Sequence, residues 1–335
     1  MSIVARIVLG LLLLSCAAAA AKAEAIKIGV VRTLAVGPIF VADDRGYFRD
    51  EGLDATIVYF DAAQPIAIAA ASGDIDFGVT GMSAAFYSLA GQGVLKIIAA
   101  GNREMPGFKN AGYLASNRAY EAGLTSLKQL AGRTAAVTQV GSQLHYDLGL
   151  AAEKYKIDLK DIRVAALQSN TNMSSALAGG QADLGVFPVT PAMRLLSRGD
   201  AKLLGWVGDE VPYGQPNTAF TSSKIANDHR ATVERFLRAF KKGARDYHDA
   251  FADASEHRRD GPTADAILAL LSTYTHQPVE QIRVAIPWLD AELRLDSQDI
   301  RRQIDWFRAQ GEIKTPVNAA EIIDQRYVVA LPGRE

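Results

Sequence analysis

Short runs of apolar residues alternate with amphipathic stretches along most of the chain, beginning at Ile26. The short runs are typical of buried strands, whereas apolar positions that recur every three or four residues indicate helices with one buried face. Their regular alternation predicts an α/β architecture. Strands are predicted over residues 26–31, 55–60, 77–80, 95–100, 113–115, 134–137, 162–165, 184–187, 202–205 and 219–221. Helices are predicted over residues 37–45, 65–71, 83–90, 142–154, 172–177 and 191–196.

Two segments echo each other and suggest that the chain contains two related halves. Residues 72–79 read Ser-Gly-Asp-Ile-Asp-Phe-Gly-Val, and residues 179–186 read Gly-Gly-Gln-Ala-Asp-Leu-Gly-Val. Upstream, residues 31–38 hold Val-Arg-Thr before Gly-Pro, and residues 137–142 hold Val-Thr-Gln before Gly-Ser. Glycine and aspartate can simply mark a helix-to-strand turn, but the similar separation of the two pairs favours a repeated strand–loop–helix plan.

Two such halves predict two α/β lobes joined by strands that cross between them. We expect residues 24–111 and 220–335 to form the first lobe and residues 112–219 the second. In open α/β sheets, small molecules bind beyond the carboxyl ends of the strands, which places a ligand cleft between the lobes, closed by a hinge motion. The end of the chain is mostly helical, and we expect it to pack on the first lobe as helices over residues 232–248, 263–274, 279–286 and 297–309.

The first residues differ from everything that follows them. Arg6 precedes an apolar run over residues 7–14, and a stretch of small residues over 17–25 contains Ala-Lys-Ala at 21–23. This arrangement predicts a secretory signal peptide over residues 1–23. Because no later run of 18 apolar residues follows, we expect the mature chain to be soluble and exported to the periplasm.

The single cysteine of the chain, Cys16, lies in this leader, in the sequence Leu-Leu-Ser-Cys. That tetrapeptide also resembles a bacterial lipobox, in which the cysteine carries a lipid anchor. Removal of Cys16 with the leader is the alternative, and the Ala-Lys-Ala site downstream favours it. In both cases the mature body has no disulfide, thiol metal site or cysteine nucleophile.

Composition and motifs exclude several functions. The chain of 335 residues is 49% hydrophobic and has a formal net charge of −1, which suits two domains and gives no basic footprint for nucleic acid. No dinucleotide-binding glycine motif, Walker loop or Gly-x-Ser-x-Gly elbow is present, and the five histidines show no metal-ligand spacing. We therefore predict no catalytic residue, cofactor or metal, and no nucleic-acid partner.

Residues 37–53 carry the strongest resemblance to a known family. They read Gly-Pro-Ile-Phe-Val-Ala-Asp-Asp-Arg-Gly-Tyr-Phe-Arg-Asp-Glu-Gly-Leu. This stretch resembles the opening of periplasmic binding proteins of the nitrate/sulfonate/taurine and thiamine-pyrimidine-precursor group, the NMT1/THI5-like family. Physically, Gly46 would end a helix, Tyr47 and Phe48 would pack under it, and Gly52 would turn into a strand. These are structural roles, so they indicate the fold and not the ligand.

Three further segments resemble the same group, and the resemblance covers about residues 26–250. They are residues 70–81, residues 126–133 and the Gly-Ser-Gln-Leu-His-Tyr stretch at 141–146, which is similar to a motif of sulfonate/taurine-type members. The resemblance implies a periplasmic-binding-protein type II fold with a helical C-terminal extension on the first lobe. It also implies a monomer that delivers a small organic anion to the permease of an ABC importer. A sulfonate, a taurine-like molecule or a carboxylate, including an aromatic acid, would fit.

Gly141 and Ser142 are the sharpest candidates for ligand contact. A glycine that permits close approach, a hydroxyl at the helix start and free amides together make an anion site. Capping of the helix alone would also explain Ser142. His145, one turn further on, would donate to an acidic group of the ligand or else serve in packing.

Loops at the other strand ends supply the remaining candidates. Arg103 follows a strand and is suited to bind a carboxylate or sulfonate through two hydrogen bonds, unless it is a solvated loop residue; Arg32 is a second candidate. The full set of candidate ligand-binding residues is Thr33, Leu34, Gly37, Pro38, Thr80, Gly81, Met82, Ser83, Arg103, Gln139, Gly141, Ser142, His145, Thr171, Asn172, Pro188 and Thr190.

Two other functions compete with that of a transport protein. Enzymes on the same fold act on a pyrimidine or menaquinone precursor, but those that resemble the former use a cysteine-rich motif that the mature chain lacks. A ligand-sensing protein that docks on a membrane receptor would share every feature above.

Overall fold

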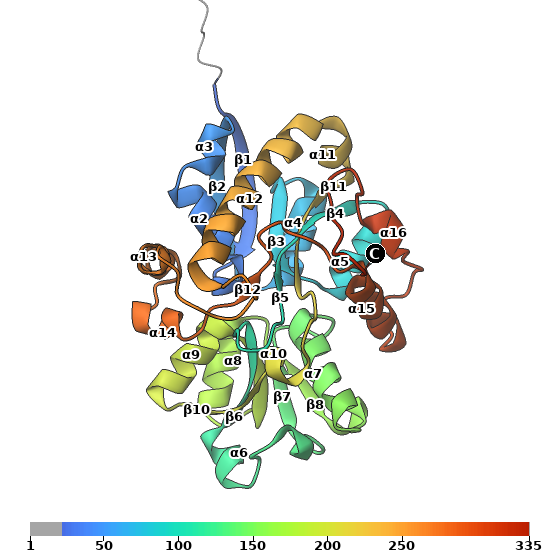
Figure 1. The fold of residues 1–335 in the computed structure, drawn as a ribbon. Coiled ribbons are helices and arrows are strands. Elements are labelled where there is room, and N and C mark those ends of the chain that lie inside the picture. The colour runs from blue at the N-terminus through green and yellow to red at the C-terminus, as the bar shows by residue number, and fades with distance from the viewer. Residues whose placement is uncertain (1–21, 335) are drawn as a thin grey trace, which may run out of the picture.

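The computed structural model describes residues 22–334. The predicted signal peptide, except Lys22 and Ala23, and the candidate lipid anchor Cys16 lie outside the described residues. Two five-stranded sheets, one above the other in Figure 1, form the body of the molecule. None of the helices within residues 22–334 combines the length and the apolar run needed to cross a membrane.

The first sheet has the strand order β2-β1-β3-β11-β4. Strand β1 runs parallel to both β2 and β3, and β11 runs antiparallel to β3 and β4. The strands are β1 (Glu24–Val31), β2 (Leu53–Phe60), β3 (Phe77–Gly81), β4 (Leu95–Ala100) and β11 (Asn217–Ser222). The accompanying helices are η1 (Leu34–Val36), α2 (Gly37–Asp44), α3 (Tyr47–Asp50), α4 (Ala63–Ser72) and α5 (Ala84–Gly91).

The second sheet repeats this plan, with the order β8-β7-β9-β6-β10. Here β7 runs parallel to β8 and β9, and β6 runs antiparallel to β9 and β10. The strands are β6 (Ala111–Ser116), β7 (Thr134–Val137), β8 (Arg163–Ala166), β9 (Leu184–Pro188) and β10 (Ala201–Trp206). The helices are α6 (Asn117–Glu121), η2 (Leu127–Gln129), α7 (Gln143–Lys154), η3 (Leu159–Asp161), α8 (Asn170–Ala178), α9 (Val189–Arg198) and α10 (Val207–Glu210).

The matching strand orders explain the echo in the sequence. The two echoed segments lead into β3 and β9, which are the central strands of their sheets. The predicted α/β class with two related sheets is therefore confirmed. Strands β6 and β11 begin at Ala111 and Asn217, a few residues from the predicted lobe boundaries; the exact division into lobes stays a prediction.

Two crossing segments join the sheets and run side by side. The Gly101 amide donates to the Asn217 carbonyl at 2.9 Å, and the Glu104 amide donates to the Gly214 carbonyl at 2.9 Å. The Tyr213 amide donates in return to the Glu104 carbonyl at 2.6 Å. Strand β5 (Asn102–Arg103) also pairs with β12 (Trp288–Leu289). A pair of hydrogen-bonded connections of this kind is suited to act as a hinge.

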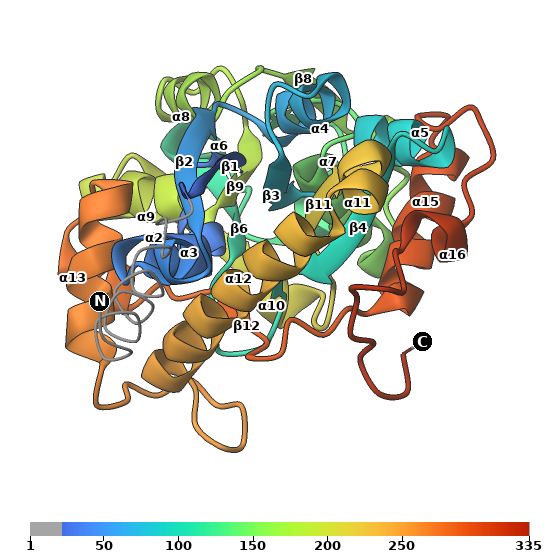
Figure 2. The same ribbon diagram turned by 90° about the horizontal axis from the view of Figure 1, so that it is seen from above.

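The C-terminal part covers the first sheet and also reaches the second. Its helices are α11 (Ser223–Asp228), α12 (Arg230–Phe251), α13 (Ala264–Thr275), α14 (Val279–Arg283), α15 (Ser297–Ala309) and α16 (Ala319–Ile322). Helix α12 packs on the first sheet (Figure 2). There the Phe236 ring stacks on the Phe77 ring, with 4.0 Å between the ring centroids. Helix α14 contacts α9, and α15 contacts both α5 and α7. The extension therefore lies on the first lobe, as predicted, and in addition bridges the two lobes.

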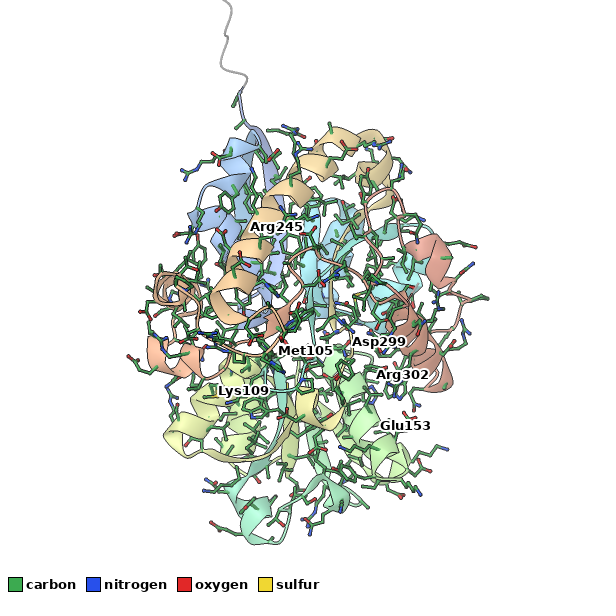
Figure 3. All side chains as sticks on the ribbon, in the orientation of Figure 1. Met105, Lys109, Glu153, Arg245, Asp299 and Arg302 are labelled. Atoms are coloured by element: carbon green, nitrogen blue, oxygen red, sulfur yellow. The ribbon has the colours of Figure 1, made fainter. Side chains whose placement is uncertain are left out.

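Close approach between α7 and α15 depends on a glycine. The Trp306 ring of α15 lies against Gly149, where an added Cβ would overlap the ring. The same ring meets the His145 and Tyr146 rings edge-on, at 5.2 and 5.3 Å between centroids. Near the C-terminal end of α7, Glu153 pairs with Arg302 of α15 at 3.6 Å (Figure 3). One face of the second lobe is thus attached to the C-terminal extension by packing.

Candidate functional site

A cavity lies between the two sheets at the carboxyl ends of their parallel strands. Its volume is about 80 Å³. The first sheet and its crossing segment contribute Val31, Thr33, Ala35, Val36, Ala62, Ala63, Thr80, Gly81, Pro216 and Asn217. The second half contributes Asn110, Ala111, Thr138, Ser142, Gln143, Leu144, Asp147, Asn170 and Pro188. This is the place where α/β sheets bind ligands.

Direct hydrogen bonds close the two halves over this cavity. The Ala84 amide donates to the Gly141 carbonyl at 2.8 Å, next to an antiparallel bridge between Ser83 and Ser142. On another side, the Leu34 amide donates to Thr190 Oγ1 at 3.0 Å. The side-chain amide of Gln277 donates to the Thr190 carbonyl at 2.8 Å. The structure therefore holds the lobes in contact rather than apart.

The start of α7 forms one wall of the cavity. Ser142 caps this helix, because its Oγ accepts the His145 amide at 3.3 Å. Gly141 has a φ of +76°, a left-handed conformation that disfavours any side chain. The first amides of a helix have no carbonyl partner within it, and here they belong to Gln143 and Leu144, which both line the cavity. Amides at the start of a helix can donate to a ligand, particularly to an anion.

His145 does not line the cavity. Its Nδ1 accepts the Gly141 amide at 3.1 Å, and its ring packs against Trp306. Burial lowers the pKa of His145 to about 4, so the ring is neutral at physiological pH. It stabilises the loop before α7 and does not face the ligand space.

Gln143 and Asp147 lie four residues apart on α7, and both residues line the cavity. The Gln143 amide nitrogen donates to Asp147 Oδ1 at 2.9 Å. Asp147 is 2% exposed, and removal from water raises the pKa of its carboxyl to about 7. The negative charge of Asp299, on α15, acts in the same direction. A carboxyl group with such a pKa titrates near neutrality, which is unusual for a structural residue.

The cavity wall carries acceptors without partners. Asp147 Oδ2, Gln143 Oε1 and Asn170 Oδ1 are buried, and none has a hydrogen-bond partner among the described residues. The described residues that line the cavity include no Lys, Arg or His. Throughout residues 22–334, no group of three or more His, Cys, Asp or Glu side chains could hold a metal ion.

The structure brings together only part of the candidate set from the sequence. Thr33, Thr80, Gly81, Ser142 and Pro188 line the cavity. They come from both halves of the chain: Thr33 and Ser142 follow β1 and β7, whereas Thr80, Gly81 and Pro188 are the last residues of β3 and β9. The cavity therefore lies at the strand ends where a ligand was expected.

Arg103 lies elsewhere. Its Nη2 is 3.5 Å from Asp296 Oδ2 and donates to the Tyr213 carbonyl at 3.3 Å. The side chain is 7% exposed, and burial lowers the pKa of its guanidinium. Arg32 also has partners away from the cavity: it donates to the Tyr274 carbonyl and lies 3.5 Å above the Tyr59 ring.

The other candidates support the walls or line a separate groove. Leu34 and Thr190 hold the lobes together, Met82 Sδ accepts from Thr218, and Ser83 caps α5. Gly37 and Pro38 begin α2, where an added Cβ at Gly37 would overlap Tyr247. Thr171 lines an outer groove beside α8 together with Thr190, and the Asn172 side chain donates to the Leu167 carbonyl. Gln139 follows β7 without lining the cavity. A role of these residues in binding stays a prediction.

Several lining residues escaped the sequence analysis. Asn110 immediately precedes β6 and Asn217 is the first residue of β11, and both antiparallel strands begin at the edge where the parallel strands end. Gln143 and Asp147 come after Ser142 and are four residues apart, a spacing that places both on one face of a helix. That spacing is a usable signal, whereas the edge position of Asn110 and Asn217 requires the sheet topology.

Two lobes of equal topology with a cavity at the facing strand ends define the class of two-lobed α/β binding-protein folds. Solved structures share this architecture. The alkanesulfonate-binding protein SsuA from Xanthomonas axonopodis pv. citri, bound to MOPS, is 20% identical with a TM-score of 0.72, covering 91% of this chain and 99% of that one. The aliphatic sulphonate binding protein SsuA from Escherichia coli is 18% identical with a TM-score of 0.69, and the match covers 93% of this chain and 95% of that one. The nitrate-binding protein NrtA from Synechocystis PCC 6803 is 11% identical with a TM-score of 0.71, and the match covers 91% of this chain and 87% of that one.

The chain belongs to the NMT1/THI5-like family, whose model matches residues 34–253. This confirms the family that the Gly-Tyr-Phe segment indicated. A search of curated protein sequences gives no significant match. At identities of this size, the likeness to solved structures establishes the fold and leaves the ligand open.

Proposed function

We propose that this protein is the solute-binding component of an ABC-type importer and holds a small organic molecule between its lobes. The observation that carries the proposal is the cavity itself. It lies at the carboxyl ends of two sheets of equal topology, and hydrogen bonds from both lobes close over it. Relatives of the same fold are binding proteins for sulfonates and nitrate. A cavity with mixed polar and apolar walls suits capture of a small molecule.

An acidic group on the ligand would lie at the start of α7. Gln143 and Leu144, the first two residues of α7, line this space, and the positive end of the helix dipole favours negative charge there. The hydroxyls of Thr33 and Thr80, on the opposite wall, would donate further hydrogen bonds. This is how a carboxylate or sulfonate would bind without an arginine.

The remaining parts of the proposal follow from this role. A binding component acts as a monomer outside the inner membrane and docks on the permease of its importer. The signal-peptide pattern at residues 1–23 supports export to the periplasm. A receptor in place of the permease would produce the same structure, and neighbouring genes for a permease and an ATPase would decide between them.

The test is identification of the bound molecule by native mass spectrometry of the purified mature chain. A molecule retained by the native protein and released on unfolding is expected. Ala63→Trp, which places an indole in the cavity, should abolish retention. Ile68→Trp on the same helix is the control, because Ile68 is 56% exposed and does not line the cavity. Equal retention by both variants would refute binding in this cavity.

A further inference from the structure

We propose that Asp147 takes part in ligand binding as a neutral acid, so that an anion enters the cavity together with one proton. This inference rests on the proposed function and adds a condition under which the anion binds. Gln143, at the start of α7, and Asp147, four residues further along, both line the cavity. The space proposed for an anion therefore has an acidic residue in its wall.

The first argument is that the cavity offers no positive side chain to an anion. The described residues that line it include no Lys, Arg or His. Arg103 is committed to Asp296, and Arg32 donates to the Tyr274 carbonyl. An anion and an ionised Asp147 would therefore be like charges in a cavity of about 80 Å³. Because like charges in one buried site disfavour ionisation, Asp147 should hold a proton when an anion is bound.

The second argument concerns the hydrogen bonds of Asp147. This residue is 2% exposed, and its Oδ1 accepts a hydrogen bond from the Gln143 side-chain amide at 2.9 Å. Its Oδ2 is buried and has no partner among the described residues. A charged oxygen that is buried without a donor is unfavourable. A proton on Oδ2 removes the charge and makes this oxygen a donor. The unpaired oxygen is thus the place where the structure accommodates a proton.

The groups around Asp147 supply further negative charge. Burial raises the pKa of Asp147 to about 7 in spite of the hydrogen bond to Oδ1, and the charge of Asp299 on α15, labelled in Figure 3, also raises it. Glu104 on the crossing segment, Tyr113 on β6 and Tyr146 on α7 also interact with the charge of Asp147. No cation within residues 22–334 is among the groups that shift this pKa. The proton on Asp147 therefore has no positive side chain to compete with.

A bound anion should raise the pKa of Asp147 further. One helical turn is roughly 5 Å, and two like charges at that distance, in surroundings less polar than water, repel strongly enough to weaken binding roughly a hundredfold. An anion that binds the ionised form is therefore accompanied by a proton. Below about pH 6 Asp147 is already neutral and affinity should be constant, whereas above about pH 7 affinity should fall as the pH rises.

The experiment measures affinity against pH by calorimetry with three probes: methanesulfonate, ethanesulfonate and nitrate. All three stay ionised between pH 5.5 and pH 8.5, so any pH dependence belongs to the protein. At least one probe should bind at pH 6, and its affinity should be at least tenfold weaker at pH 8.5. An affinity that is constant over this range, or that rises with pH, would overturn the inference.

The proton itself is measured on the wild-type protein, without any variant. Calorimetry in two amine buffers that differ in their enthalpy of ionisation gives the number of protons taken up on binding. The uptake should be close to one proton per bound anion at pH 8 and close to zero at pH 6. Release of a proton, or no uptake at pH 8, would contradict the inference.

Asp147→Asn tests the residue, and Glu104→Gln is the matched control. Both replace a buried carboxyl group by an amide of the same size, but Glu104 does not line the cavity. The ratio of affinities between pH 6 and pH 8.5 should drop below twofold in Asp147→Asn and stay at tenfold or more in Glu104→Gln. A ratio that persists in Asp147→Asn, or that disappears only in Glu104→Gln, would assign the proton elsewhere and refute the role of Asp147.

Failure of this inference and failure of the proposed function give different results. If none of the three anions binds at pH 6 but the native protein retains another molecule, the inference is overturned and the proposed function stands. If no anion binds and nothing is retained, both fail.

Discussion

Replacement of Thr190 by valine tests whether the contact between lobes controls binding. The Leu34 amide donates to Thr190 Oγ1 at 3.0 Å across the cleft, and Thr190 is buried. Valine has nearly the same shape as threonine but no hydroxyl. In the closed form the Leu34 amide would then be buried without an acceptor, whereas in an open form water would bind it. The substitution therefore penalises closure and leaves each lobe intact.

The magnitude follows from the cost of a buried unpaired donor, about 1–3 kcal/mol. At about 1.4 kcal/mol per factor of ten, the closed form loses roughly 5- to 150-fold in population relative to the open form. The dissociation constant of the ligand should rise by the same factor. The hydrogen bond from Gln277 to the Thr190 carbonyl does not depend on the side chain and is unaffected.

Two measurements check this prediction. Calorimetry with the ligand identified by mass spectrometry gives the change in affinity. Spin labels on Asp50→Cys and Lys160→Cys, one exposed position in each lobe, report opening directly. The sole natural cysteine is Cys16, in the predicted leader, so the labels are specific in the mature chain. Thr190→Ser keeps the hydroxyl and serves as the control. If Thr190→Val binds as tightly as Thr190→Ser, the contact has no part in closure.

Three further predictions concern stability. Gly149→Val should lower the free energy of unfolding by about 1–3 kcal/mol, because its side chain would overlap the Trp306 ring; a neutral effect in urea unfolding would show that α15 does not pack tightly on α7. Asp147 has its pKa raised from 3.8 to about 7, so the folded state binds its proton more tightly than the unfolded state. The free energy of unfolding that Asp147 contributes should therefore fall by about 4 kcal/mol at most between pH 4 and pH 7 and stay constant above pH 7. Urea titrations at several pH values should show this fall in the wild type and not in Asp147→Asn. Ser142→Ala should cost about 1 kcal/mol by loss of the α7 cap, and Ser142→Asn should restore it; equal melting temperatures for all three would argue against capping.

Local patterns were sufficient for the elements and the family. The predicted strands over 95–100 and 134–137 and the helix over 297–309 match β4, β7 and α15 to the residue. Short apolar runs and helical periodicity are properties of neighbouring residues, so they can be recognised without the fold. The helix predicted over 279–286 ends early, at Arg283, because the chain turns there toward β12.

The site was only partly accessible by the same reasoning. Thr80 was found because it ends a predicted strand and Ser142 because it lies in the loop after one, and strand ends mark ligand sites in this architecture. Arg103 also follows a strand, but it pairs with Asp296, a residue 193 positions away. No local pattern indicates such a partner.

The sequence alone determined the α/β class, the repeat and the family, because periodicity, turn residues and the segment around Gly46 depend only on residues that are close together in the chain. Tertiary structure decided which strand ends meet and which polar groups are left without partners. Asp147 illustrates the difference: its place on α7 is visible in the sequence, but its burial beside Asp299 depends on where α15 packs. Burial, charge environment and unpaired hydrogen-bonding groups arise from contacts between distant segments, and these determine what the cavity can hold.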